Sequence, residues 1–194
     1  MKFKEFLLLL SIILLIFSCK TKEVELVTPE PQEVVTPLTP EEPIITEEQL
    51  QEDAEYLRSI NNIKTEEVVT KEEFSEDKAE ILRIIQELSI IMQEHDVNSW
   101  LNYITPESKA FYSNPINLRK AQKKLPNKML QLNSIKDYFN YVFIPSRKIS
   151  KVDEIRYISK TNVKAVEVRE DKSILVYYYF QKIDGKWLVN LPKL

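Results

Sequence analysis

Apolar residues recur with a helical period through the first part of the region that we expect to fold. Six of them fall at spacings of three and four, which makes one wide apolar face; they are Ile81, Ile84, Ile85, Leu88, Ile91 and Met92. The preceding Phe74-Ser75-Glu76-Asp77 offers an N-cap serine and acidic residues for the positive end of a helix. The pattern predicts a core helix over 75–94. Val97, Trp100, Leu101 and Ile104 extend the apolar spacing into a second, short helix.

Three further helices are predicted from their start and stop signals. Thr105-Pro106-Glu107 and Asn114-Pro115 each combine an N-cap residue with proline at the first helical position. They predict helices near 106–112 and 115–124. Ser134 to Asp137 forms a looser capping box, so we expect a helix over 135–143 that ends before Pro145.

After Pro145 the apolar period changes from helical spacing to alternation. Four segments rich in Val, Ile and Tyr follow, joined by short connections; they cover 152–159, 163–170, 174–182 and 186–191. Asp184-Gly185 suits a type I′ hairpin turn, and the chain's single glycine therefore has a structural role. Helices followed by an antiparallel meander predict an α+β fold, with the N-terminal helices packed on the C-terminal sheet.

The first eighteen residues have the pattern of a targeting segment. Lys2 and Lys4 precede twelve residues, 6–17, that are apolar apart from Ser11. A bilayer-spanning helix needs about 20 residues, so this stretch fits the core of a signal peptide. An uncleaved N-terminal anchor and an ordinary secretory signal followed by a chance cysteine are the alternatives.

The segment ends in Ile16-Phe17-Ser18-Cys19, with the chain's only cysteine. It resembles the lipobox of bacterial lipoproteins, and the bulky Phe17 is similar to the looser lipoboxes of spirochaetes. The resemblance implies that residues 1–18 are a lipoprotein signal peptide. Cys19 would then become the N-terminus, with palmitate-type acyl chains on its sulfur and its amine. Several such chains would hold the protein stably on a lipid bilayer.

Residues 19–74 are predicted to form an acidic, proline-rich tether. Five prolines between 29 and 43 favour extended chain. Thr46 to Gln49 has capping-box spacing, which predicts a possible helix at 47–60, and the pattern leaves open whether it packs on the domain. Residues 20–80 carry a net charge of −12 and residues 81–194 one of +8. The acidic segment could therefore lie against the domain as an electrostatic cover that weakens with salt.

Residues 75–194 resemble the NTF2-like (cystatin-like α+β) superfamily. The resemblance is carried by the helix at 75–94, by His95-Asp96-Val97-Asn98-Ser99-Trp100-Leu101 leading to Thr105-Pro106-Glu107, and by the hairpin from Tyr177 to Trp187. It implies a curved sheet wrapped around a long helix to form a cone. The departure lies in 106–144, which reads as nearly all helical where many members have an early strand pair.

Some members of that superfamily are isomerases, hydratases or cyclases with an Asp or His base inside the cone. Here His95 and Asp96 are adjacent and lie just past the long helix, where a histidine suits the negative helix end. We interpret His95 as a helix cap and expect no enzyme activity. A single Gly excludes glycine-rich phosphate loops, and one Cys and one His exclude zinc centres built from several of them. No cofactor or metal is predicted.

Two groups of residues are candidate binding sites. The first is aromatic and could line a ligand pocket; it comprises Trp100, Tyr103, Tyr157, Tyr177, Tyr179 and Trp187. The alternative is an ordinary sheet, in which Tyr177 and Tyr179 share one face, Tyr178 and Phe180 share the other, and one of these faces meets the helices.

The second group is basic, and its first four members fall on one side of the predicted helix at 115–124; it comprises Arg119, Lys120, Lys123, Lys124 and Lys128. Such a strip could meet anionic lipid, an acidic glycan or an acidic protein. The alternative is a solvated helix face. Nucleic acid is not an expected partner, since no recognition motif is present.

The sequence thus predicts a lipid-anchored protein of the cell envelope, on the outer-membrane surface or facing the periplasm. Its domain is expected to be a non-catalytic binding module for an envelope or host macromolecule or for a small apolar ligand. A periplasmic small-ligand carrier, an NTF2-like enzyme and an envelope-assembly scaffold are the alternatives.

Overall fold

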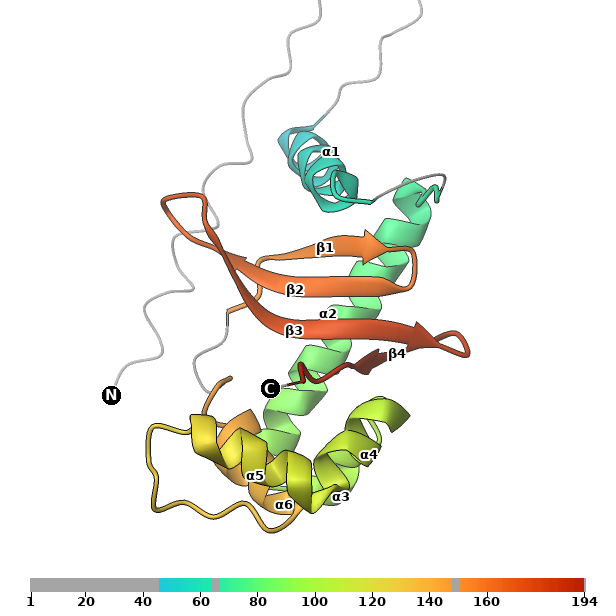
Figure 1. Cartoon of the computed structure of the whole chain (residues 1–194). Helices are drawn as coiled ribbons and strands as arrows, with labels where there is room; N and C mark the ends of the chain where they lie inside the picture. Colours follow the sequence, from blue (N-terminus) through green and yellow to red (C-terminus); the bar gives the residue numbers. More distant parts are fainter. Residues whose placement is uncertain (1–45, 64–66, 148–150, 194) are drawn as a thin grey trace, which may run out of the picture. The chain divides into compact units, whose positions relative to one another are not determined.

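A computed structural model describes residues 46–63, 67–147 and 151–193, which belong to a compact unit over residues 44–194 (Figure 1). The signal segment, Cys19 and the proline-rich stretch lie outside the described residues. The helices are α1 (Glu47–Ile60), α2 (Lys71–Glu94), α3 (Val97–Leu101), α4 (Pro106–Ser113), α5 (Pro115–Lys124) and α6 (Ile135–Tyr138), continued by a π-helical turn, η1 (Phe139–Phe143). Within the described ranges, none of the helices has both the length and the apolar character required to span a bilayer.

Four antiparallel strands follow the helices and pair in sequence order. They are β1 (Glu154–Ser159), β2 (Asn162–Val168), β3 (Ile174–Ile183) and β4 (Lys186–Val189). The last hairpin turns at Asp184 and Gly185, whose φ angles of 49° and 77° confirm the predicted type I′ turn. The α+β order of helices and then a meander is also confirmed.

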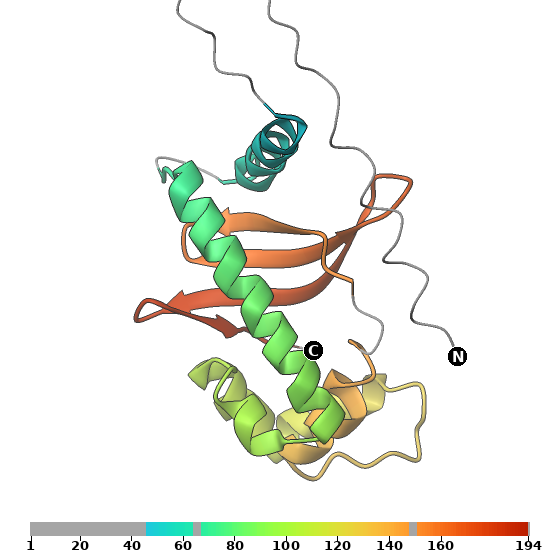
Figure 2. The same ribbon diagram turned by 180° about the vertical axis from the view of Figure 1, so that it is seen from behind.

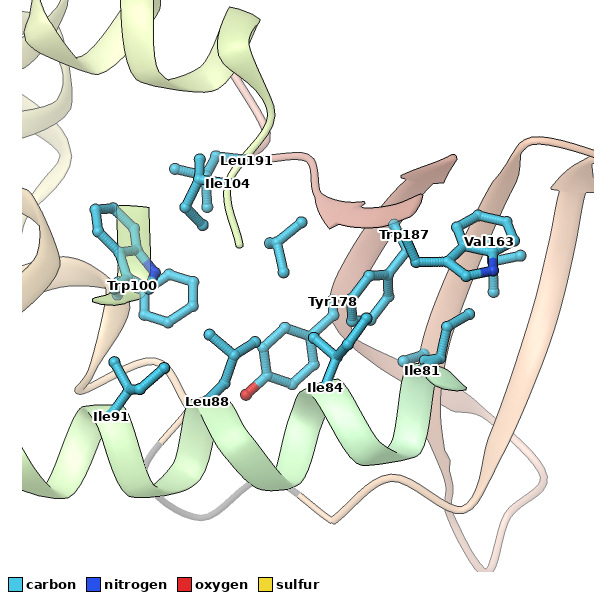
Figure 3. Close-up of a cluster of buried hydrophobic side chains, with 14 of the residues drawn as sticks. Ile81, Ile84, Leu88, Ile91, Trp100, Ile104, Val163, Tyr178, Trp187 and Leu191 are labelled. Atoms are coloured by element: carbon cyan, nitrogen blue, oxygen red, sulfur yellow. The ribbon is translucent and has the colours of Figure 1, made fainter. Parts of the chain in front are cut away.

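The long helix α2 lies across one face of the sheet, as Figure 2 shows from behind. Its apolar stripe, including Ile81, Ile84 and Leu88, packs on that face beside Tyr178 and Trp187 (Figure 3). Tyr178 and Phe180 are both buried, whereas Tyr177 and Tyr179 remain partly exposed on the opposite face. The inner face is therefore the one that carries Tyr178.

The helices after α2 form a second part of the same core. Trp100 on α3 packs against Phe139 and Phe143, with ring centroids 4.8 Å and 5.1 Å away. The amide of Thr105 donates to the carbonyl of Val189, which ties this part to β4. The interpretation of 106–144 as nearly all helical is confirmed, with one difference at its end. The chain widens into a π turn at Phe139, and this turn brings both Phe139 and Phe143 into the core against Trp100.

The start of α2 differs from the prediction. The helix begins at Lys71 behind a capping box of Thr70 and Glu73, so the expected start at Ser75 was wrong, and residue 75 falls inside the helix. The earlier start is stabilised by burial, because the first turn places the Phe74 ring, 1% exposed, in the core.

The predicted helix at 47–60 is present as α1, and it packs on the sheet beside β1. Its Tyr56 ring lies 5.6 Å from that of Phe74, and the Tyr56 hydroxyl donates to the carbonyl of Val69 over 2.7 Å. Arg58 forms an ion pair of 2.7 Å with Glu154 on β1. The question that the sequence left open is thereby answered, since α1 is docked.

Candidate functional site

The six aromatic candidates do not meet in one pocket. Trp100, Tyr157 and Trp187 are buried in the core. Tyr103 is partly exposed beside α2, and its hydroxyl donates to Glu87 over 2.6 Å, which raises the pKa of Tyr103 and lowers that of Glu87. Tyr177 and Tyr179 lie on the outer face of the sheet, where the Tyr177 hydroxyl donates to Glu167. The hypothesis of a single aromatic pocket is therefore replaced by the alternative of a core face and a half-exposed tyrosine face.

Two of the buried aromatic candidates share a polar partner that the sequence analysis missed. Asp77 on α2, 7% exposed, accepts hydrogen bonds from the Tyr157 hydroxyl over 2.7 Å and from Trp187 Nε1 over 2.8 Å. Lys182 Nζ lies 2.8 Å from the same carboxylate. Burial, followed by the bond to Asp77, raises the pKa of the Tyr157 hydroxyl. The carboxylate is occupied by three donors, and its role is to hold α2 on the sheet.

An open pocket lies beside α2, between that helix, the turn after η1 and strand β3. It encloses about 880 Å³, which is within the range of small-ligand sites. Apolar atoms come from Leu82, Ile85, Met92, Ile144 and Pro145, and polar groups come from Gln86, Ser89, Gln93, His95, Arg147 and Tyr178. Figure 3 shows the Tyr178 hydroxyl pointing toward α2.

Arg147 supplies the only cation among the described residues that line this pocket. Its guanidinium carbon lies 4.0 Å from the Phe143 ring centroid and 5.0 Å from that of Tyr178. Nη1 donates to the Ser146 hydroxyl over 2.8 Å, while Nε has no hydrogen-bond partner among the described residues. Within the same ranges no carboxylate lies at ion-pair distance. Burial lowers the pKa of the Arg147 guanidinium.

Local geometry explains how Arg147 reaches this place. The amide of Ile144 donates to the carbonyl of Phe139 and closes the π turn, and Pro145 has no amide to continue a helix. The amide of Arg147 then donates to the carbonyl of Ile144 over 3.0 Å. The amide of Ser146 also donates to the carbonyl of Val142 over 3.3 Å, so the chain coils on for one more turn, and this turn carries Arg147 to the pocket beside α2 and β3.

His95 also lines the pocket. It adopts left-handed geometry with φ of 54°, and its amide donates to carbonyls of the last turn of α2. The prediction that His95 caps this helix is confirmed. Its Nδ1 lies 2.7 Å from Asn140 Oδ1 on η1, so the imidazole also joins the end of α2 to η1.

The basic candidates lie together on α5 and in the loop that follows it. Arg119, Lys120, Lys123, Lys124 and Lys128 are all exposed, whereas Leu118 and Ala121 on the other side of α5 are buried. The prediction that the first four share one side of a helix is confirmed. This surface is separate from the pocket, because none of its residues lines that cavity.

Two further predictions from the sequence concern metal binding and lipidation. In the part of the chain that the structure describes, no three His, Cys, Asp or Glu side chains are grouped so that they could hold a metal ion. Cys19 lies outside the described residues, and its acylation remains a prediction.

Comparison with known proteins relates the chain to a lipoprotein. It is 34% identical over 119 residues to an uncharacterized lipoprotein of Treponema pallidum (strain Nichols). The match covers 61% of this chain and 63% of that protein. No family model and no solved structure matches. The similarity supports the interpretation of the chain as a spirochaete-like lipoprotein.

Proposed function

We propose that this protein is a lipid-anchored envelope lipoprotein whose domain is a non-catalytic binding module. The pocket beside α2 would accept an amphipathic molecule with an acidic head group and an apolar body. One observation carries the proposal: Arg147 lies in a partly apolar pocket without a carboxylate partner among the described residues.

The charge of Arg147 favours an anionic ligand. Burial lowers the pKa of its guanidinium, which means that the surroundings solvate the positive charge poorly. The Phe143 and Tyr178 rings stabilise the cation only in part. A carboxylate or phosphate that accepted hydrogen bonds from the Nη atoms would offset the remaining cost and add directional contacts.

The rest of the lining favours an apolar body on that ligand. Leu82, Ile85 and Met92 on α2 line the cavity, and Ile144 and Pro145 line it from the turn after η1. Methylene groups leaving water for such a surface contribute about 0.8 kcal/mol each. A short-chain acid would gain little from this surface, so a longer acyl or aryl acid is the class of ligand that fits.

The wider assignment is part of the same proposal. A long helix across a four-stranded antiparallel meander, with an Asp-Gly turn in the last hairpin, is the arrangement that the NTF2-like resemblance implies. Similarity to a spirochaetal lipoprotein supports acylation of Cys19 and anchoring in the cell envelope. An NTF2-like enzyme would require a free acid or base in its cavity. Asp77, the buried carboxylate on α2, is instead bound by three donors and does not line the pocket. His95 does line it, but its backbone caps α2 and its Nδ1 is engaged with Asn140.

A fluorescent fatty acid tests the proposal directly. The mature chain would be made with Cys19→Ser, so that no acyl chain competes, and titrated with a dansyl-labelled undecanoic acid. We expect blue-shifted emission on binding to the unchanged pocket. Arg147→Gln should weaken binding by about 10-fold or more, because a hydrogen bond to a charged group contributes about 1.5–3 kcal/mol.

Two controls separate the pocket from non-specific binding. Arg169→Gln removes an exposed arginine next to β2 and should leave the affinity unchanged. The methyl ester of the probe should bind the unchanged pocket no better than the acid binds Arg147→Gln. Equal affinities of acid and ester, or equal losses in Arg147→Gln and Arg169→Gln, would rule out the proposed site.

A further inference from the structure

The exposed side of α5 carries cations from its middle to its end. The α5 cationic face is defined here as Arg119, Lys120, Lys123, Lys124 and Lys128, flanked by the apolar side chains of Ile116 and Met129. Residues 116, 119, 120, 123 and 124 follow the spacing of three and four that places side chains on one side of a helix. Leu118 and Ala121 are buried on the other side and fix α5 in this orientation.

No acidic group neutralises this face within the described residues. None of its five cations takes part in an ion pair there, and Lys128 Nζ donates to the carbonyl of Lys123. Residues 105–147 contain eight basic and two acidic residues, a net of +6. Both acids are already engaged: Glu107 pairs with Lys193 over 2.6 Å, and Asp137 caps α6. The described residues therefore do not neutralise the positive charge of this part of the domain, and it is available to an external partner.

The two apolar side chains indicate what kind of partner that is. Ile116 is 55% exposed at the start of α5, and Met129, 88% exposed, follows Lys128 in the next loop. A soluble acidic protein or glycan would explain the cations. It would not explain the exposed methionine, because such a polar partner offers no apolar surface to bury it. A bilayer surface explains both, because head groups attract Lys and Arg while apolar side chains enter the acyl boundary.

We propose that the α5 cationic face docks on the anionic head groups of the bilayer in which the lipoprotein is anchored. Each Lys or Arg near an anionic surface contributes about 1 kcal/mol. An acyl anchor would add a high local concentration of head groups. Docking would hold the domain against the membrane in a fixed orientation. This surface is distinct from the α2 pocket, so the inference rests on the proposed lipid anchor and not on the ligand of the pocket, and either can fail without the other.

An environment-sensitive label on the mature lipoprotein tests this docking. Met129→Cys, labelled with NBD, would be reconstituted into vesicles of phosphatidylcholine alone or with added phosphatidylglycerol. The fluorescence emission of the label should shift to the blue and increase in intensity only when phosphatidylglycerol is present, and added salt should reverse both changes. Ile174→Cys, which replaces an exposed apolar residue at the start of β3, should show the same spectrum in both vesicles.

Two double variants that change the net charge equally distinguish an effect of this face from an effect of net charge. Lys120→Glu with Lys124→Glu should abolish the shift of the label at residue 129. Lys172→Glu with Lys186→Glu, both at exposed hairpin ends, should leave it intact. Equal losses in the two double variants would overturn the proposal, as would identical spectra in both vesicles. A salt-sensitive shift already present in pure phosphatidylcholine would also overturn it, in favour of the chain's own acidic residues 20–45 as the occupant.

Discussion

Asp77 ties α2 to three of the four strands. Its carboxylate accepts hydrogen bonds from Tyr157 on β1 and Trp187 on β4, and it pairs with Lys182 on β3. All three donors lie on the inner face of the sheet, where Tyr157 and Trp187 are buried. Removing the acceptor would leave buried donors without partners, and each such donor costs about 1–3 kcal/mol.

We therefore expect Asp77→Ala to lower the free energy of unfolding by about 2–4 kcal/mol, as the sum over two buried donors after partial relaxation. Asp77→Asn keeps one acceptor oxygen and should cost less. Glu76→Ala changes an exposed neighbour on the same helix and should have little effect. Urea unfolding followed by far-UV circular dichroism measures all three. Similar losses in Asp77→Ala and Glu76→Ala would show that the hydrogen bonds do not hold α2 in place.

A sequence signal for Asp77 existed, whereas none existed for Arg147. Position 77 lies four residues before Ile81 and seven before Ile84, and so it falls on the apolar stripe of α2. A carboxylate on a buried stripe requires partners, and this could have been inferred. Arg147 is only a basic residue after Pro145 in the sequence. Its place beside Phe143 and Tyr178 depends on the packing of η1 against β3.

The ends of elements were predictable wherever the signal is local. The caps at Thr105, Asn114 and Ser134 all form, because each depends on a side chain and an amide two or three residues away. The start of α2 was not predictable in this way, since Thr70 and Ser75 both have capping chemistry. The choice between them is made by the burial of Phe74 against α1 and the core.

The turn between β3 and β4 allows a clean test of backbone geometry. Gly185 has φ of 77°, and a Cβ built on it meets nothing within 4 Å. Gly185→Ala should therefore lower the free energy of unfolding by about 1–2 kcal/mol through left-handed strain alone. Gly185→Asn should lose less, because Asn tolerates this conformation better. Thermal unfolding compares the two, and a larger loss for Asn would contradict the assignment of the cost to the backbone.

At the scale of the whole molecule, the order of helices and strands followed from periodicity, but their docking did not. Alternation predicted that Tyr178 and Phe180 share a face, and it could not decide which face meets the helices. The pocket combines α2, the turn at 144–147 and β3, three segments far apart in the sequence. The aromatic candidates were chosen by residue type alone, and so the predicted set mixed buried residues with outer-face residues.

The chain's two tryptophans report on different parts of one core. Trp187 packs where α2 meets the sheet, and Trp100 packs among the helices beside Phe139 and Phe143. α2 passes both regions, with Ile81 and Ile84 near Trp187 and Ile91 nearer Trp100 (Figure 3). A helix shared in this way couples the two regions, since neither keeps its packing when α2 unfolds.

We therefore expect cooperative unfolding of the sheet and the helices, and single-tryptophan variants can test it. In Trp100→Phe the fluorescence of Trp187 should change at the same urea concentration as the far-UV circular dichroism. In Trp187→Phe the fluorescence of Trp100 should also change at the same urea concentration as the far-UV circular dichroism. The urea midpoint of this variant should be lower, because it loses the hydrogen bond to Asp77. Each comparison is made within one variant, so the different stabilities do not matter. A Trp100 transition that precedes the loss of ellipticity would show that the helical part unfolds independently, and the pocket would then open before the sheet is lost.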